Sequence, residues 1–267
     1  MAPGSAGAGF SIVTPSFNQA CFIERTLQSV LSQQTGRVVE YIVIDGGSSD
    51  GTLEVLQRYA GRIRMVSEPD RGMADALNKG FAMCTGEIIG WLNSDDLYLA
   101  GTLEKVAGWF DCHPESLWLY GNCRIIDEQD REIRKWITAY KNRSARNYSY
   151  NRLLVENFIS QPAVFIRREA LAKAGLLDTE LPTAMDFDLW LRLGRLGAPG
   201  YMREDLACFR VHRDSISSKG FRQQFEEQYR IHKRYDQSRW RLLSHRIRNR
   251  LIVTVYSVMD QLRGSGR

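Results

Sequence analysis

The fold is decided by residues 86–96, which read Gly86-Glu87-Ile88-Ile89-Gly90-Trp91-Leu92-Asn93-Ser94-Asp95-Asp96. Their apolar run predicts a strand that is buried on both faces in a parallel sheet. The run ends at two adjacent carboxylates, and ligands of open α/β sheets bind at the carboxyl ends of such strands. Because hard divalent cations prefer carboxylate oxygens, the stretch predicts a metal-bridged diphosphate site. Asp96 is the first candidate ligand and Asp95 is the second.

A simpler interpretation of the same stretch is a helix cap. Ser94, Asp95 or Asp96 could accept hydrogen bonds from the first turn of a helix that we expect to start near Gly101. The stretch alone favours neither interpretation.

Length and composition are those of an ordinary globular protein. The 267 residues, 43% hydrophobic and 25% charged, suit one large domain or one domain with a small appendage. No apolar run approaches about 18 residues, so the sequence predicts no transmembrane helix. Residues 1–9 are small and glycine-rich and predict a flexible lead-in rather than a signal peptide. The five scattered cysteines indicate neither disulfides nor a zinc site and favour a cytoplasmic location.

The positive charge is concentrated in the last part of the chain. Residues 221–267 carry a balance of +7 against −2 for residues 1–220. Two helices are expected in this segment, and the second has an apolar stripe of Leu243, Ile247, Leu251, Val255, Met259 and Leu262. A basic amphipathic helix of this kind can lie on an anionic membrane, pack on the core or form a homodimer. Nucleic acid is not expected as a partner, because no recognised binding module accompanies the basic residues.

Strands and helices alternate along the first 96 residues. Apolar runs predict strands at residues 10–14, 41–44 and 63–66, and apolar spacing predicts helices at 23–31, 53–60 and 73–83. Pro15 is expected to end the first strand and Asn18 to cap the helix that follows. This alternation predicts a parallel sheet with right-handed crossovers. Neither a dinucleotide fingerprint nor a P-loop is present in the sequence.

The second half of the chain is less regular. Helices are expected at residues 102–110, at 168–174 and from Met185 onward, and strands at 117–121 and 161–166, with a further strand ending in residues 208–215. The polar region 122–150, with strand-like pieces such as residues 133–137, suits an acceptor-binding half. His212 alternates with Arg210, so both side chains should project to the same face.

Six segments of the chain, taken in order, carry a resemblance to a known family. They are Ser11-Ile12-Val13-Thr14-Pro15-Ser16-Phe17-Asn18, Asp45-Gly46-Gly47-Ser48-Ser49-Asp50-Gly51-Thr52, Asp70-Arg71-Gly72-Met73-Ala74-Asp75-Ala76-Leu77-Asn78-Lys79-Gly80, Asn93-Ser94-Asp95-Asp96, Gln161-Pro162 and Asp186-Phe187-Asp188-Leu189-Trp190-Leu191-Arg192. Together they resemble the family 2 glycosyltransferases with a GT-A fold, over residues 10–217 or about four fifths of the chain.

The resemblance implies an α/β, Rossmann-like GT-A fold with a mixed, mostly parallel sheet flanked by helices. It implies a flexible segment 1–9, a catalytic domain 10–220 and a basic, amphipathic helical extension 221–267. Within the domain, residues 10–100 would form the nucleotide-binding half and residues 101–220 the acceptor-binding half.

The resemblance also assigns expected roles on the donor side. Pro15, Phe17 and Asn18 would border the nucleotide pocket. Asp45 would accept hydrogen bonds from the base, with Asp50 nearby.

The remaining expected roles concern the diphosphate and the acceptor. Arg71 would lie near the diphosphate or the donor sugar. Ser94, Asp95 and Asp96 match the family's metal-binding Asp-x-Asp position, with Ser94 in place of the first acid, Asp96 as the best-placed ligand and Asp95 as a second one. His212 matches a place where some relatives bring a histidine toward the diphosphate, and is a further candidate metal ligand.

The family's catalytic base normally sits in a Glu-Asp pair. Here the pair reads Met185-Asp186, so Asp186 is the matching base and Asp188 is the second candidate.

The activity implied is inverting transfer of one sugar from a UDP-, GDP- or dTDP-sugar, with Mn²⁺ or Mg²⁺, to a glycan or lipid-linked acceptor. Synthesis of a cell-surface polysaccharide, lipopolysaccharide or glycolipid at the cytoplasmic face of the inner membrane fits the basic tail. A non-catalytic nucleotide-sugar-binding module is the main alternative. A nucleotidyltransferase is disfavoured, because residues 15–18 do not resemble the glycine- and arginine-rich loop of such enzymes.

Overall fold

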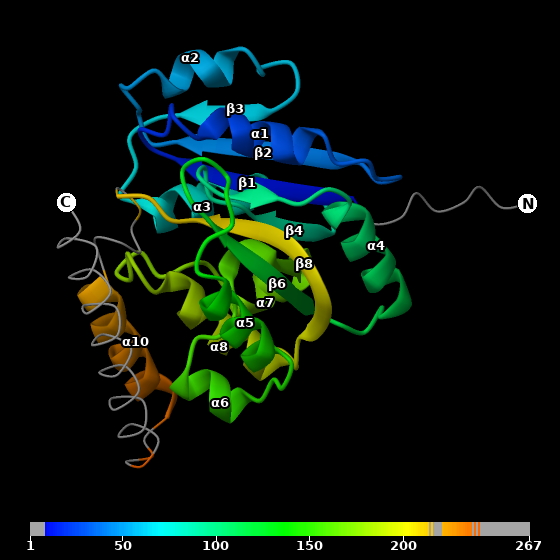
Figure 1. Cartoon of the computed structure of the whole chain (residues 1–267), viewed down its shortest axis with the longest axis vertical. Coiled ribbons are helices and arrows are strands. Elements are labelled where there is room, and N and C mark those ends of the chain that lie inside the picture. Colours follow the sequence, from blue (N-terminus) through cyan, green and yellow to red (C-terminus); the bar gives the residue numbers. More distant parts are fainter. Residues whose placement is uncertain (1–8, 214, 216–220, 237, 239, 241–267) are drawn as a thin grey trace, which may run out of the picture.

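The computed structural model describes residues 9–213, 215, 221–236, 238 and 240 (Figure 1). Its eight-stranded sheet has the order β3-β2-β1-β4-β7-β6-β8-β5. The strands are β1 Phe10–Ser16, β2 Val39–Asp45, β3 Arg64–Ser67, β4 Ile88–Trp91, β5 Leu97–Tyr98, β6 Trp118–Ile126, β7 Val164–Arg167 and β8 Gly200–Arg210. Of the seven pairings between these described strands, four are parallel. The predicted mixed, mostly parallel α/β sheet is therefore confirmed.

The first four strands form the predicted parallel unit. β1 lies between β2 and β4 and is parallel to both, and β3 extends the sheet beyond β2. β1 does not end at Pro15, as the sequence suggested, but continues to Ser16, whose carbonyl accepts a hydrogen bond from Gly46 N at 2.8 Å. A proline removes only the bond that its own N–H would donate, and its fixed φ is compatible with an extended strand.

Helices cover both faces of the sheet. One face packs against α1 Ile23–Leu31, α2 Thr52–Gln57 and α4 Thr102–Cys112, and the other against α3 Met73–Met83, α5 Lys135–Ala145, α6 Tyr150–Val155, α7 Arg168–Ala174 and α8 Met185–Leu196. β1 contributes side chains to both faces, because Ile12 packs on the side of α1, α2 and α4 and Val13 packs on the side of α3. α3 lies so close to β1 that a Cβ added at Gly80 would meet Val13 Cγ1 at 2.4 Å.

Two local expectations were wrong. Asn18 does not cap α1, whose N-cap is Phe22 without a side-chain bond; instead Asn18 Oδ1 accepts from Ser49 N at 2.9 Å. Residues 133–137 are not a strand, because α5 begins at Lys135. The buried positions of α5 include Ile137 and Ser144, which are seven residues apart, and a window of five residues cannot reveal that helical period.

The second half returns the chain to the middle of the sheet. β7 is antiparallel to both β4 and β6, after the short 3₁₀ turn Gln161–Ala163. β8 runs parallel to β6 and brings residue 210 beside the loop that follows β4.

The final described helix is α10 Phe221–Tyr235, which packs against α8 and α6 (Figure 1). The apolar stripe expected from Leu243 to Leu262 lies outside the described residues, as do residues 1–8. Among the helices described, none has the length and apolar content needed to cross a membrane.

Candidate active site

The loops after β1 and β2 are joined by side-chain hydrogen bonds at the carboxyl edge of the sheet. Asp45, the last residue of β2, is fully buried. Its Oδ2 accepts from Gly47 N at 3.0 Å, from Ser48 N at 2.9 Å and from Ser67 Oγ at 2.8 Å, and its Oδ1 accepts from Ser48 Oγ at 2.5 Å. Asp45 therefore fixes the shape of the 46–48 loop.

The neighbouring loop after β1 is held in the same way. Asn18 N donates to Ser48 Oγ at 2.8 Å, and Ala20 N donates to Asp50 Oδ2 at 3.0 Å. Burial of Asp50 is slight, and hydrogen bonds from Thr52 and Ala20 outweigh it and lower the pKa of the Asp50 carboxyl. Phe17, which follows β1 directly, has 59% of its surface exposed. Pro15, Phe17, Asn18, Asp45 and Asp50 therefore lie at one edge of the sheet, and their role at a nucleotide pocket stays a prediction.

Arg71 lies on the loop that leads into α3. Its side chain is 81% exposed and its Nη2 is 3.2 Å from Asp75 Oδ1. An exposed guanidinium with one weak, solvent-screened partner is free to turn toward an anion.

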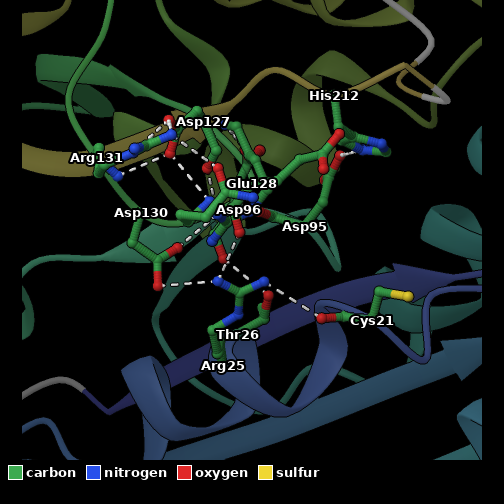
Figure 2. A network of polar contacts seen from close by, with 12 residues as sticks. Cys21, Arg25, Thr26, Asp95, Asp96, Asp127, Glu128, Asp130, Arg131 and His212 are labelled. Carbon is green, nitrogen blue, oxygen red and sulfur yellow. Dashed lines mark hydrogen bonds and ion pairs between the residues drawn. The ribbon is translucent and has the colours of Figure 1, made fainter.

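The two carboxylates after β4 have different surroundings (Figure 2). Asp96 is fully buried: its Oδ1 accepts from Arg210 N at 2.8 Å and its Oδ2 from Asn93 Nδ2 at 3.3 Å. Burial, and then the neighbouring Asp95 carboxylate, raise the pKa of Asp96 well above its ordinary value. Asp95 is instead partly exposed, and its Oδ2 lies 3.0 Å from His212 Nε2.

The helix-cap interpretation of this stretch is wrong. β5 follows Asp96 directly, and α4 starts only after Gly101, which has no side chain to cap it. The carbonyls of Ser94 and Asp96 instead accept hydrogen bonds from Thr26 Oγ1, both at 2.9 Å, so a side chain of α1 holds this loop in place.

Arg210 organises this region, although motif and spacing predicted no role for it. Its guanidinium is fully buried and donates from Nε to the Asp95 carbonyl at 2.7 Å. Its Nη1 donates to the Asp127 carbonyl at 2.7 Å and pairs with Asp130 at 2.5 Å. The predicted alternation puts His212 two residues further on, where its ring also contacts Phe22 at a centroid distance of 4.6 Å. Arg210 therefore holds both the Asp95 loop and the turn that follows β6.

A pocket of about 140 Å³ lies beside Asp95. It is lined by Met73, Trp91, Asn93, Asp95, Gln161, Pro182, Thr183, Met185, Asp186, Phe209, Ser215 and Gln224. Segments from β4, the start of α8, the end of β8 and α10 all contribute to it. Asp95 and Asp186, 91 positions apart in the chain, thus line one pocket.

Asp186 and Asp188 differ in what they face. Asp186 lines the pocket; its Oδ2 accepts from Asn157 Nδ2 at 3.3 Å and its Oδ1 from Phe187 N at 2.7 Å. Burial raises the pKa of the Asp186 carboxyl above its ordinary value. Asp188 does not line the pocket and is bonded to Arg192 Nε at 2.8 Å and to the Tyr235 hydroxyl at 2.9 Å. Asp188 therefore joins α8 to α10.

Residues 11–175 match the family model described as glycosyl transferase family 2. The chain belongs to glycosyltransferase family 2. The family match confirms the predicted family, and it ends before Asp186, Arg210 and His212.

Bacterial glycosyltransferases are among the sequence relatives of this chain. A PGL/p-HBAD biosynthesis glycosyltransferase of Mycobacterium tuberculosis is 30% identical over 188 residues, which cover 68% of each chain. An uncharacterized glycosyltransferase of Rickettsia conorii is 27% identical over 213 residues, covering 78% of this chain. The match spans only 35% of that Rickettsia protein.

Solved structures confirm the GT-A fold of this glycosyltransferase. Staphylococcus aureus TarS 1–349 in complex with UDP-GlcNAc superimposes with a TM-score of 0.67 at 17% identity, covering 84% of this chain and 65% of that one. The mannosyltransferase PcManGT of Pyrobaculum calidifontis, in complex with GDP-Man and Mn²⁺, gives 0.66 at 17% identity, covering 96% and 81%.

Proposed function

We propose that this glycosyltransferase moves one sugar, with inversion, from a nucleoside-diphosphate sugar to a hydroxyl of a glycan or lipid-linked acceptor. The observation that carries the proposal is that Asp95 and Asp186 line the same pocket of about 140 Å³. A carboxylate that can bind a metal at the donor diphosphate and a carboxylate that can take a proton from the acceptor must both face the reacting atoms.

The donor is a nucleoside-diphosphate sugar bound at the carboxyl edge of the sheet. UDP-GlcNAc in TarS and GDP-Man in PcManGT, two proteins of the same fold, support this choice. Phe17, Asn18 and Asp50 border the base, and Asp45 acts through the 46–48 loop that its carboxylate shapes. UDP, GDP and dTDP are all compatible with this loop.

We propose that a divalent metal, Mn²⁺ or Mg²⁺, binds beside Asp95. The described residues contain no group of three or more His, Cys, Asp or Glu side chains that could hold a metal, so the proposal rests on a single pair. Asp95 Oδ2 and His212 Nε2 lie 3.0 Å apart at the end of β4 and just after β8, and carboxylate and imidazole are both metal ligands. Asp96, first choice from the sequence, has one oxygen bonded to Arg210 N and the other to Asn93. We therefore assign Asp95 and His212 as ligands, with Asp96 and Ser94 holding the loop. When bound, the metal neutralises charge on the departing diphosphate.

The residues of the chain account for the remaining steps. The acceptor hydroxyl attacks the anomeric carbon opposite the diphosphate, and Asp186 Oδ2 takes its proton. Asn157 and the Phe187 N–H hold the carboxylate in place for this transfer. Arg71 turns from Asp75 toward the leaving diphosphate and stabilises its growing charge. Because attack is direct, the configuration inverts and no covalent sugar–enzyme intermediate forms.

The acceptor belongs to the bacterial cell envelope, at the cytoplasmic face of the membrane. The relative named for PGL/p-HBAD biosynthesis supports a glycolipid or cell-surface glycan. The charge balance of +7 in residues 221–267 supports contact with anionic lipid.

A donor screen tests the proposal. Purified chain is incubated with UDP-, GDP- or dTDP-sugars, Mn²⁺ or Mg²⁺ and bacterial lipid extract, and released nucleotide is followed. We expect metal-dependent release from one donor, lost in Asp95→Asn and Asp186→Asn. The matched control Asp111→Asn makes the same chemical change at a side chain on α4 that is 53% exposed and pairs with Arg37, and it should behave as the wild type. Donor binding without release in any mixture would instead indicate a non-catalytic nucleotide-sugar-binding module.

A further inference from the structure

The helix that carries Asp186 starts without a cap of its own. α8 begins at Met185, and its N-cap residue, Ala184, makes no side-chain cap hydrogen bond. The first N–H groups of a helix have no partner within the helix and need acceptors from elsewhere. Thr183, Met185 and Asp186 all line the pocket, so the geometry of this helix start sets the geometry of the pocket wall.

Glu227 of α10, more than 40 positions further along the chain, supplies an acceptor to the N-cap residue Ala184 and to Thr183 before it. Its Oε2 accepts from Thr183 N at 2.9 Å, from Thr183 Oγ1 at 2.8 Å and from Ala184 N at 3.0 Å. Its Oε1 accepts from Gln223 Nε2 at 2.9 Å. Glu227 is fully buried, and an ionised carboxylate tolerates burial only when several donors satisfy it, as they do here. The negative charge also suits the positive end of the helix dipole.

α10 also reaches the pocket directly. Gln224, one helical turn before Glu227, is one of the pocket-lining residues, and Ser215 lines the pocket just before α10 begins. One turn of α10 therefore contacts the pocket wall and caps the helix that bears Asp186. This segment lies beyond residue 175, where the family match ends.

We propose that Glu227 is a positioning residue, which holds the start of α8 so that the Asp186 carboxylate meets the acceptor hydroxyl. The inference rests on the proposed role of Asp186 as base. It gives α10 a part in catalysis, because a shift of about 1 Å in a reacting group can lower the rate about 100-fold.

The test compares two variants of similar size. Glu227→Gln keeps the length of the side chain and an oxygen that accepts from Thr183 N and Ala184 N. Glu227→Asp keeps the charge but withdraws the carboxylate by one methylene. The control is Arg234→Ala on the same helix, which cuts an exposed ion pair of 2.9 Å with Asp178. The readouts are kcat and donor KM from released nucleotide, thermal unfolding, and hydrogen exchange of the Thr183 and Ala184 amides.

We expect Glu227→Asp to lower kcat about 10- to 100-fold and to change donor KM less than about threefold. Glu227→Gln should retain most of the wild-type kcat. Exchange at Thr183 and Ala184 should quicken only in Glu227→Asp. The inference is overturned if Glu227→Asp keeps wild-type kcat, or if kcat follows thermal stability equally in Glu227→Asp and Arg234→Ala. A wild-type chain that turns over no donor overturns the proposed function instead, and the amide exchange still shows whether Glu227 caps α8.

Discussion

Replacing Asp186 with asparagine should change activity and stability in opposite directions. A positioned general base contributes about 10²- to 10⁴-fold to a rate, so kcat of Asp186→Asn should fall by that factor, or by about 3 to 5 kcal/mol of barrier. The amide is close in size to the carboxylate and still accepts from Phe187 N. In the described part of the chain Oδ1 of Asn157 accepts no hydrogen bond, so a flip of the Asn157 amide provides a partner for the new NH₂ group.

The stability change follows from the direction in which burial moves the pKa. Burial raises the pKa of Asp186 in the folded state above its value in the unfolded chain. The ionised carboxylate is therefore less favourable in the folded protein, and its contribution to stability falls as pH rises from the unfolded pKa through the folded one. At neutral pH the asparagine variant should be more stable, by about 1.4 kcal/mol for every tenfold difference between the folded and unfolded acid dissociation constants. Below both pKa values the difference should disappear.

The assay combines nucleotide release with urea unfolding over a range of pH. In the wild type, kcat should rise with pH as Asp186 ionises, at a higher pH than an exposed aspartate would give, and the asparagine variant should lack this rise. An asparagine variant that retains more than about a tenth of wild-type kcat, or that shows the same rise with pH, would refute the assignment of Asp186 as base.

Two further predictions concern packing and the buried arginine. Gly80→Ala should lower the free energy of unfolding in urea by about 1–3 kcal/mol, because its Cβ would lie 2.4 Å from Val13 Cγ1. Gly108→Ala, also in a helix but with nothing within 4 Å of the added Cβ, should raise it by up to about 1 kcal/mol. Equal effects of the two substitutions would contradict the close packing of α3. Arg210→Met should lower the free energy of unfolding by about 3 kcal/mol. This is the low end of the range for breaking a buried ion pair, because the partner Asp130 is 40% exposed. A variant as stable as the wild type would show that Arg210 does not hold the loops.

The first half of the fold could be predicted because its signals are local. β1 to β4 are short apolar runs, each followed by polar or glycine-rich residues, and α3 was predicted with its observed bounds of Met73–Met83. The same apolar runs placed Asp45 and Asp95 at one edge of the sheet. Parallel pairing then brings their loops together without further information.

The burial of Asp96 and the partial exposure of Asp95 could not be predicted in this way. Which carboxylate turns inward depends on Arg210, whose N–H meets Asp96 across 114 residues of sequence. Likewise, the capping of α8 depends on Glu227, more than 40 residues further along. Periodicity and motif spacing describe neighbours along the chain, whereas these partners are set by tertiary packing.

We propose that Asp95, which lines one pocket together with Asp186, and its neighbour His212 bind the metal of the donor complex. The most direct test is a Mn²⁺ titration followed by electron paramagnetic resonance in the presence of UDP or GDP. Asp95→Asn is compared with Asp96→Asn, which keeps an oxygen for Arg210 N. We predict that Asp95→Asn weakens Mn²⁺ binding at least about tenfold and Asp96→Asn much less. Wild-type binding in Asp95→Asn, with loss in Asp96→Asn, would contradict the claim.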